Sequence, residues 1–155
     1  MSSPLIGVIS DTHGLLRPEA VEKLHGVDHI IHAGDVGIPD ILNELSRIAP
    51  VTAVRGNVDR GGWAEKLPLT TVVEVGGVSI YVIHILQDLN LDPAAAGFGA
   101  VISGHSHKRA EKTENGVLFL NPGSLGARRF HLPVSMAHLR VADGRLEPEF
   151  IELDV

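Results

Sequence analysis

The sequence predicts an α/β fold on the basis of its strand pattern, its composition and its turns. Short runs of Val, Ile and Leu alternate with helical segments in the first third of the chain. Aromatic residues make up only 4%, so aliphatic side chains must fill the core, as in buried strands flanked by helices. Two-residue turn signals later in the chain indicate antiparallel hairpins. With 155 residues, the chain has the length of one domain, and we expect a single domain over 1–155.

The first third is predicted to alternate strands and helices. Apolar runs predict the strands, and a proline in the position of the first helical residue begins each helix. The predicted strands are Leu5–Ile9, Val27–His32 and Val51–Val54, with helices from Pro18 to about His25 and from Pro39 onward. This βαβαβ order predicts a parallel sheet with right-handed crossovers.

The remainder of the chain is predicted to consist mainly of hairpins. The pairs are 70–75 with 78–83, 108–113 with 117–120, and 134–141 with 145–152, joined by Gly-Gly, Asn-Gly and Asp-Gly turns. A further strand is expected at Ala100–Ser103, and a short helix around Ala94–Ala96. Two mixed sheets packed face to face with helices outside would account for this order.

Composition and charge exclude several classes of partner. A net charge of -6 repels a polyphosphate backbone, so we expect no extended nucleic acid, although a small anionic substrate remains compatible. The chain has no basic leader and no apolar run of ~20 residues, so we expect a cytoplasmic protein without a membrane partner. A homo-oligomer is left open. Because cysteine is absent, any metal must be held by His, Asp, Glu or Asn.

Four of the predicted strands end in short polar clusters. Strand ends in an open α/β sheet converge on one crevice, so residues far apart in sequence can form one site there. Carboxylate, amide and imidazole groups together suit Mn, Fe, Zn or Ni, and two such ions can promote hydrolysis without a protein nucleophile. The clusters are Asp11-Thr12-His13-Gly14, Gly34-Asp35, Gly56-Asn57-Val58-Asp59 and Gly104-His105-Ser106-His107.

This order of blocks, D-x-H, G-D, G-N, a lone His and G-H-x-H, resembles the calcineurin-like metallophosphoesterase superfamily. The small YfcE-type phosphodiesterases are the most similar members. The resemblance covers essentially the whole chain and implies a four-layer αββα sandwich of two mixed sheets flanked by helices. It also implies two divalent metal ions. Manganese is the expected metal, with nickel, iron, zinc and magnesium as alternatives.

The resemblance also implies a role for each site residue. Asp11, His13 and His107 would hold one ion, and Asn57, His84 and His105 the other. Asp35 would bridge the two ions. A hydroxide between the ions would attack phosphorus in line, while the ions, Asn57 and His105 stabilise charge on the equatorial oxygens.

The expected substrate is a small phosphodiester. Two divalent ions, less two carboxylates and one hydroxide, leave a formal charge of about +1 that a diester neutralises, although a monoester remains compatible. Val58 occupies a position where many superfamily members have His, which predicts a preference for acidic leaving groups. Ile85 follows His84 where Gly is common, so the assignment of His84 depends on its order in the sequence and on the resemblance.

Several residues have ordinary structural interpretations beside functional ones. Asp59 either orients a ligand or closes a turn. The pairs Lys108-Arg109 and Arg128-Arg129 either bind phosphate or are solvated. Asn121, Gly123 and Ser124 either line the site or form a turn, and Trp63 is expected to cover the core. The histidines expected to be structural are His25, His29, His32, His131 and His138.

The main alternative function is that of a non-catalytic scaffold, because the retromer complex contains a protein-binding subunit of this same fold. The complete ligand set favours an enzyme instead. A nucleotide-binding module or a serine hydrolase would need a glycine-rich phosphate loop or a G-x-S-x-G turn, and the sequence contains neither.

Overall fold

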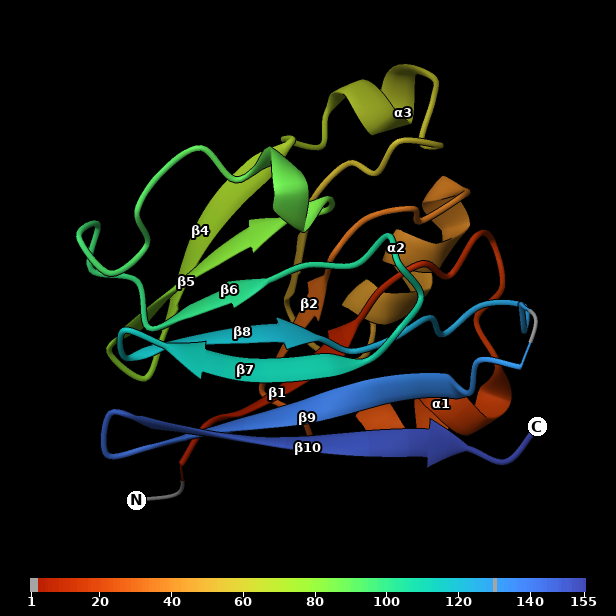
Figure 1. Cartoon of the computed structure of the whole chain (residues 1–155). Coiled ribbons are helices and arrows are strands. Elements are labelled where there is room, and N and C mark those ends of the chain that lie inside the picture. The colour runs from red at the N-terminus through yellow and green to blue at the C-terminus, as the bar shows by residue number, and fades with distance from the viewer. Residues whose placement is uncertain (1–2, 130) are drawn as a thin grey trace.

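The computed structural model describes residues 3–129 and 131–155 and consists of two five-stranded mixed sheets packed face to face (Figure 1). The first sheet has the order β10-β9-β1-β2-β3. Its strands are β1 (Leu5–Ile9), β2 (His29–His32), β3 (Val51–Ala53), β9 (Val134–Ala142) and β10 (Arg145–Leu153). As predicted, β1, β2 and β3 are parallel, whereas β9 runs antiparallel to β1 and β10.

The second sheet has the order β4-β5-β6-β8-β7. Its strands are β4 (Thr70–Val75), β5 (Val78–Ile83), β6 (Ala100–Ile102), β7 (Ala110–Glu114) and β8 (Val117–Asn121). The predicted hairpins β4/β5 and β7/β8 are confirmed, as is β9/β10 in the first sheet. Strands β5, β6 and β8 are parallel, so their carboxyl ends lie at the same edge.

The main core lies between the two sheets. Its fully buried members are all Ile, Val, Leu or Ala, as the scarcity of aromatic residues predicts. Burial of each larger aliphatic side chain contributes roughly 1.5–3 kcal/mol, so this layer fixes how the sheets face each other. Central examples are Val8 and Ile31 in the first sheet and Val82 and Ile102 in the second.

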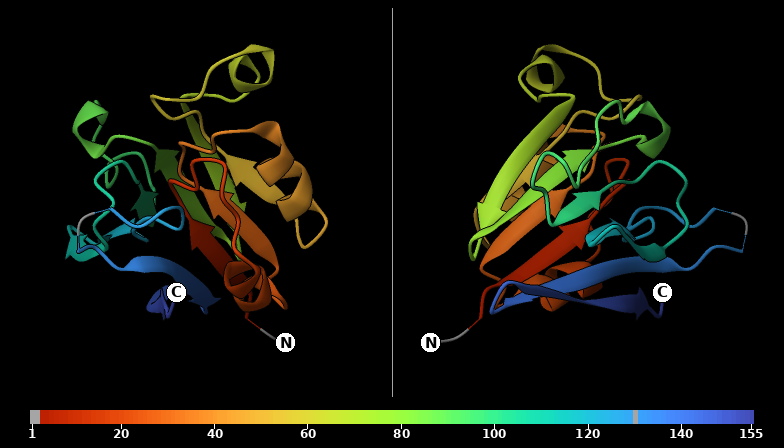
Figure 2. Two further views of the ribbon diagram at one scale, coloured as in Figure 1. Left: turned by 90° about the vertical axis from the view of Figure 1, so that its right-hand side faces the viewer. Right: turned by 60° about the vertical axis from the view of Figure 1, so that its left-hand side comes forward.

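Helices cover the outer face of the first sheet. The helices α1 (Pro18–Leu24) and α2 (Pro39–Ser46) begin at the predicted prolines and pack on this face through a second apolar cluster (Figure 2). Trp63 also packs against this cluster, as expected. The outer face of the second sheet is covered by the 3-10 turn η1 (Leu86–Asp88) and a loop to Phe98. The predicted sandwich is confirmed, with this thinner layer on one side.

Three local features differ from the sequence prediction. The short helix α3 (Gly62–Glu65) and the turn η1 were not predicted, since segments of three or four residues give no helical periodicity. The predicted helix at 94–96 is wrong. This segment forms turns, because the Asp92 carboxylate accepts hydrogen bonds from the backbone N–H groups of Ala94 and Ala95. In the described part of the chain, no helix has the length and apolar character needed to cross a membrane.

Candidate metal centre

The candidate site lies where the carboxyl ends of parallel strands from both sheets meet. The loops after β1, β2 and β3 contribute residues from the first sheet, and the segments after β5 and β6 contribute residues from the second. A continuous series of contacts, each 4.0 Å or shorter, joins all seven residues identified from the sequence. In order of contact these are His107, Asp11, His13, Asp35, His84, Asn57 and His105.

The candidate ligands include two groups of donor residues, one with Asp11, His13 and His107 and the other with Asp35, His84 and His105. Asp11 belongs to the first group. Its Oδ1 atom lies 3.4 Å from His107 Nε2 and 3.6 Å from His13 Nε2. Its Oδ2 atom accepts hydrogen bonds from the Ser10 hydroxyl at 2.6 Å and the His105 backbone N–H at 3.0 Å. One carboxylate oxygen is therefore held by the protein while the other faces two imidazoles.

Asp35 lies between the two groups. Its Oδ2 atom is 3.2 Å from His84 Nε2 and 3.7 Å from His13 Nε2, so one oxygen approaches a histidine of each group. Its Oδ1 atom accepts a hydrogen bond from the Val58 backbone N–H at 3.0 Å. This is the position expected for a carboxylate shared by two ions.

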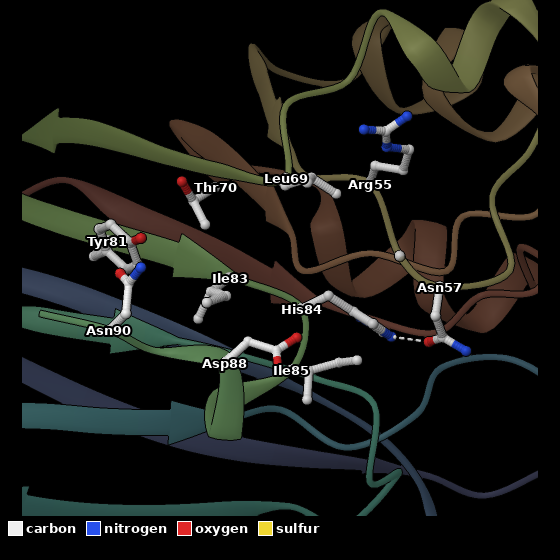
Figure 3. A pocket seen from close by; sticks show the side chains of 11 residues that line it. Arg55, Asn57, Leu69, Thr70, Tyr81, Ile83, His84, Ile85, Asp88 and Asn90 are labelled. Carbon is white, nitrogen blue, oxygen red and sulfur yellow. Dashed lines mark hydrogen bonds between the residues drawn. The ribbon is translucent and has the colours of Figure 1, made fainter.

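His84 is placed firmly despite its unusual neighbour in the sequence. It follows β5 directly, is almost fully buried, and its Nδ1 lies 2.7 Å from the Ala33 carbonyl oxygen. A carbonyl oxygen only accepts, so Nδ1 carries a proton and, in the neutral ring, Nε2 carries the lone pair. Nε2 faces Asp35 Oδ2 and lies 2.9 Å from Asn57 Oδ1 (Figure 3). A lone pair facing two oxygens requires a proton or a cation between them.

Asn57 connects the second group. Its Oδ1 atom lies 2.9 Å from His84 Nε2 and 3.2 Å from His105 Nδ1, so the amide oxygen points at both rings. Its Nδ2 atom has no hydrogen-bond acceptor among the residues that the structure describes. The amide nitrogen is directed away from the His84 ring and is available to a ligand (Figure 3).

The distances between the donor atoms suit shared binding of a divalent metal ion better than direct hydrogen bonds between them. Ligands bound about 2.0–2.2 Å from one ion lie about 3–3.5 Å apart. The distances from Asp11 Oδ1 to His13 and His107 and from Asp35 Oδ2 to His84 are close to this, and the donor atoms of each group all lie within 4.8 Å of one another. Asp11 Oδ1 and His13 Nε2 are buried and make no hydrogen bond within residues 3–129 and 131–155. The two groups that can each hold an ion are Asp11, His13 and His107, and Asp35, His84 and His105.

The backbone at the candidate ligands is strained. Seven non-glycine residues of the described chain have positive φ, and five of them are candidate ligands. The other two begin the Asn-Gly and Asp-Gly hairpin turns, where positive φ is normal. Each such residue outside a turn costs about 1–2 kcal/mol, and strain of this kind concentrates at functional sites. The five are Asp11, His13, Asp35, His105 and His107, with φ between 48° and 72°.

Two glycines leave the space into which the carboxylates fit. A Cβ atom on Gly56 would collide with the backbone nitrogen and Oδ1 of Asp35. A Cβ atom on Gly104 would collide with the Ser10 hydroxyl and lie 2.7 Å from Asp11 Oδ2. Neither glycine has positive φ, so close packing against the carboxylates accounts for the absence of a side chain at both positions.

Both carboxylates are ionised at neutral pH. Burial alone would raise the pKa of Asp11, but the nearby imidazoles of His107 and His13 and the hydrogen bond from Ser10 outweigh it and hold that pKa well below its usual range. For Asp35, burial is likewise outweighed by His84 and the Val58 N–H group, which lower its pKa. Burial would lower the pKa of His84, yet Asp35 and the Ala33 carbonyl raise it. The site thus concentrates negative charge where a cation would bind.

Asp59 supports the site, a role the sequence left open. It is 6% exposed, and its carboxylate accepts backbone N–H groups from Val36 at 3.2 Å, Gly37 at 2.9 Å and Gly56 at 2.8 Å. It therefore ties the loop that carries Asp35 to the loop that carries Asn57. The turn interpretation is also correct in part, because Gly56 is three residues before Asp59.

The segment after β8 also supports the ligand loops. Asn121 Nδ2 donates to the Gly104 carbonyl at 3.0 Å and the Ser106 hydroxyl at 3.1 Å, and Ser124 Oγ donates to the Asp11 carbonyl at 3.1 Å. These side chains hold the loops that carry Gly104 and Asp11 in place without belonging to the donor groups. No periodic pattern in the sequence predicts these contacts, since they join segments far apart along the chain.

The basic pairs make contacts elsewhere. The Arg109 guanidinium lies over the Phe150 ring, 5.7 Å from its centre, and Arg128 donates to the Val155 carbonyl at 3.4 Å. Lys108 and Arg129 are exposed. The structure therefore favours the interpretation that these pairs are solvated.

His32 is structural, as expected, and it makes the protein sensitive to acid. The ring is fully buried: Gly34 N–H donates to Nδ1 at 3.1 Å, and Nε2 lies 3.0 Å from the Thr12 hydroxyl, which donates to the Val36 carbonyl. This chain of hydrogen bonds requires the neutral ring. Burial lowers the pKa of His32 from 6.5 to about 4.

The expected consequence is a loss of stability below pH 6.5. There the unfolded chain takes up a proton that the folded protein does not, so the free energy of unfolding falls by roughly 2 kcal/mol between pH 7 and pH 4.5. Urea unfolding of the metal-free protein should show this loss, and His32→Asn should lack it. The other titrating groups are the same in both proteins, so their contributions cancel in the difference between the two pH profiles. Parallel pH profiles for the two proteins would contradict the assignment.

The chain matches the calcineurin-like phosphoesterase superfamily domain over residues 5–144. It belongs to this superfamily. A probable metallophosphoesterase of Methanothermobacter thermautotrophicus is 37% identical, covering 95% of the chain and 91% of that protein. A structure described as an archaeal phosphodiesterase superposes with a TM-score of 0.80 at 25% identity, covering 96% of the chain and 99% of the other.

The same fold also occurs in a protein whose name does not describe a phosphoesterase. Vacuolar protein sorting 29 of Cryptosporidium parvum superposes with a TM-score of 0.77 at 21% identity, covering 99% of each chain. This likeness concerns the fold alone. Superfamily membership together with the two donor groups supports a phosphoric ester hydrolase that binds divalent metal ions.

Proposed function

We propose that the protein is a phosphodiesterase that uses two divalent metal ions. The observation that carries this proposal is the position of Asp35, whose single Oδ2 atom approaches His13 of one donor group and His84 of the other. Asp11, His13 and His107 would hold one ion, Asn57, His84 and His105 the other, and Asp35 both. When bound, the ions would supply an activated water and positive charge for the phosphoryl oxygens.

The side chains of the site would orient the substrate and balance its charge. Asn57 Nδ2 is the free donor at the rim and would hydrogen-bond a non-bridging phosphoryl oxygen, with Oδ1 held toward the two rings. His105 is exposed and lies beside Asn57, so it would contact the same oxygens. Asp11, Asp35 and one hydroxide ion would together offset three of the four positive charges of the ions, and the remaining charge of about +1 supports a singly charged diester as substrate.

The direct test is hydrolysis of bis(p-nitrophenyl) phosphate by protein stripped with a chelator and then supplied with Mn²⁺, Ni²⁺, Mg²⁺ or Zn²⁺. We expect no activity in the stripped protein and recovery with at least Mn²⁺. A folded protein that stays inactive with every ion, or remains fully active after chelation, would overturn the proposal. Comparison with p-nitrophenyl phosphate measures the preference for diesters over monoesters.

Val58 leads to a prediction about the leaving group. Its side chain is 45% exposed beside Asn57 and cannot protonate a departing alcohol. We therefore expect diesters with p-nitrophenol as leaving group to react at least about a hundredfold faster than dialkyl diesters, since general acid catalysis contributes about 10²–10⁴-fold. Val58→His should reduce this ratio. Equal rates on activated and unactivated diesters in the native protein would disprove the idea.

A protein-binding scaffold is the second candidate, because vacuolar protein sorting 29 has the same fold. The buried Asp11 and His13 atoms that lack hydrogen-bond partners argue against it, since a scaffold gains nothing from strained, unpaired polar groups. The chelation experiment also separates these functions, because a scaffold would fold normally and remain inactive with every ion.

A further inference from the structure

Ser10 lies directly before Asp11, where β1 ends and the loop of the candidate metal centre begins. Its side chain is fully buried, and its hydroxyl group, which has one proton, donates a hydrogen bond to Asp11 Oδ2 at 2.6 Å. A hydrogen bond to a charged oxygen is roughly twice as strong as one between neutral groups. Ser10 therefore controls the direction of the Asp11 carboxylate.

The two oxygens of Asp11 have different surroundings. Oδ2 accepts both the Ser10 hydroxyl and the His105 backbone N–H, which use the two lone-pair positions that a carboxylate oxygen offers. Oδ1 is buried, accepts no hydrogen bond from a residue that the structure describes, and faces His13 and His107. The hydrogen bonds to Oδ2 thus leave Oδ1 as the oxygen with lone pairs for a cation.

Gly104 confines the Ser10 hydroxyl against this carboxylate. A Cβ atom on Gly104 would collide with the hydroxyl, so the two residues pack without a gap. Removing the hydroxyl would open a space beside Asp11 Oδ2 and return one lone pair to that oxygen. The carboxylate could then turn and present both oxygens to one cation.

The number of oxygens that Asp11 presents decides which ions suit the first donor group. Ca²⁺ binds about six to eight oxygens and often takes both oxygens of a carboxylate. Ions from Mn²⁺ to Zn²⁺ accept imidazole nitrogens and need fewer oxygen ligands. A group in which His13 and His107 accompany a single oxygen of Asp11 therefore favours the second class of ion.

Ser135 shows what a buried serine does in a purely structural role. It is also fully buried, and its hydroxyl donates to the Pro122 carbonyl at 2.7 Å. A Cβ atom on Gly123 would collide with that hydroxyl, as one on Gly104 would with the hydroxyl of Ser10. The two serines thus match in burial and packing and differ in their acceptor, which is a backbone carbonyl in one case and a carboxylate facing two histidines in the other.

We propose that Ser10 is a positioning residue that restricts Asp11 to binding a metal ion through Oδ1 and so selects against Ca²⁺. The proposal rests on the ligand assignment of the proposed function, in which Asp11, His13 and His107 hold one ion. Ser10 contacts neither the ion nor the substrate and acts through the Asp11 carboxylate.

The test measures how readily Ca²⁺ displaces Mn²⁺ from the purified protein, with the electron paramagnetic resonance signal of free Mn²⁺ as the readout. In the native protein, Ca²⁺ equimolar with Mn²⁺ should displace almost none of it. In Ser10→Ala, the Ca²⁺ concentration that releases half of the bound Mn²⁺ should fall about tenfold or more, since loss of a group that orients a ligand changes metal affinity about 10–100-fold. Bound Co²⁺ should also absorb more weakly in the visible range, because a second Asp11 oxygen raises its coordination number.

Ser135→Ala is the matched control, because it also loses a buried hydroxyl hydrogen bond. It should keep the native displacement curve and the native Co²⁺ spectrum. The proposal is overturned if Ser10→Ala also keeps both, if Ser135→Ala changes them equally, or if equimolar Ca²⁺ displaces Mn²⁺ from the native protein, a result that needs no variant. Each of these results leaves the proposed phosphodiesterase function intact, whereas a native protein that binds no Mn²⁺ would contradict that function.

Discussion

Replacing Asp35 with Asn is expected to abolish hydrolysis of bis(p-nitrophenyl) phosphate, lowering kcat/KM by about a thousandfold or more. The Asn oxygen can still accept the Val58 N–H group that Asp35 Oδ1 accepts at 3.0 Å, so the loop should keep its position. The variant loses the negative charge that faces His13 and His84. We therefore expect normal thermal unfolding together with reduced metal content.

Asp40→Asn is the matched control for this prediction. Asp40 is exposed in the first turn of α2, away from the donor groups, so its replacement should leave both kcat/KM and metal content unchanged. If Asp35→Asn retained native activity with its full metal content, Asp35 would not be the shared ligand.

Asp59 is not a candidate ligand, yet removal of its carboxylate is expected to lower both the stability of the fold and the affinity for metal. Asp59→Ala would leave three backbone N–H groups, two of them in the Asp35 loop, without their acceptor. Unpaired buried donors cost about 1–3 kcal/mol each, so the free energy of unfolding should fall by at least about 3 kcal/mol. Metal affinity should fall about 10–100-fold, as is usual when a group that orients a ligand is lost.

Asp59→Asn provides the graded comparison. Its amide oxygen can replace Oδ2 and keep the bonds to Val36 and Gly56, while the amide nitrogen faces the N–H group of Gly37. We expect stability and metal affinity between those of the native protein and Asp59→Ala, measured by urea unfolding and metal titration. Native metal affinity in a destabilised Asp59→Ala variant would show that Asp59 serves the fold alone.

Most site residues could be predicted from the sequence because each lies just after a predicted strand, which is a local feature of the sequence. Asp11, Asp35, Asn57 and His105 each follow a short apolar run, and parallel strands end at a common edge. Their convergence therefore follows once the strand order is right. The hairpins were predicted equally well, since two-residue turns carry a strong local signal.

The supporting contacts could not be predicted because they join distant segments. Asn121 bonds the Gly104 loop, and Asp59 bonds the Asp35 loop, only after both sheets have packed. The positive φ values of the candidate ligands are likewise imposed by the surrounding structure rather than by residue type, since histidine is not a typical turn former. The small elements α3 and η1 also depend on tertiary packing.

His84 shows how the structure adds to the sequence. Its neighbour Ile85 departs from the pattern of the superfamily, yet the ring is oriented by the Ala33 carbonyl and faces Asp35 and Asn57. We therefore propose His84 as a ligand on its geometry. The pattern of residues alone could not separate this role from that of a buried core histidine.

The measurement that tests the central proposal most directly is the metal content of the purified protein, determined by elemental analysis after gel filtration with Mn²⁺ in excess and its removal. Two donor groups joined by Asp35 predict two ions per chain and cooperative loss of both in Asp35→Asn. A folded native protein that retains one ion or none at saturating Mn²⁺ would contradict the two-metal site.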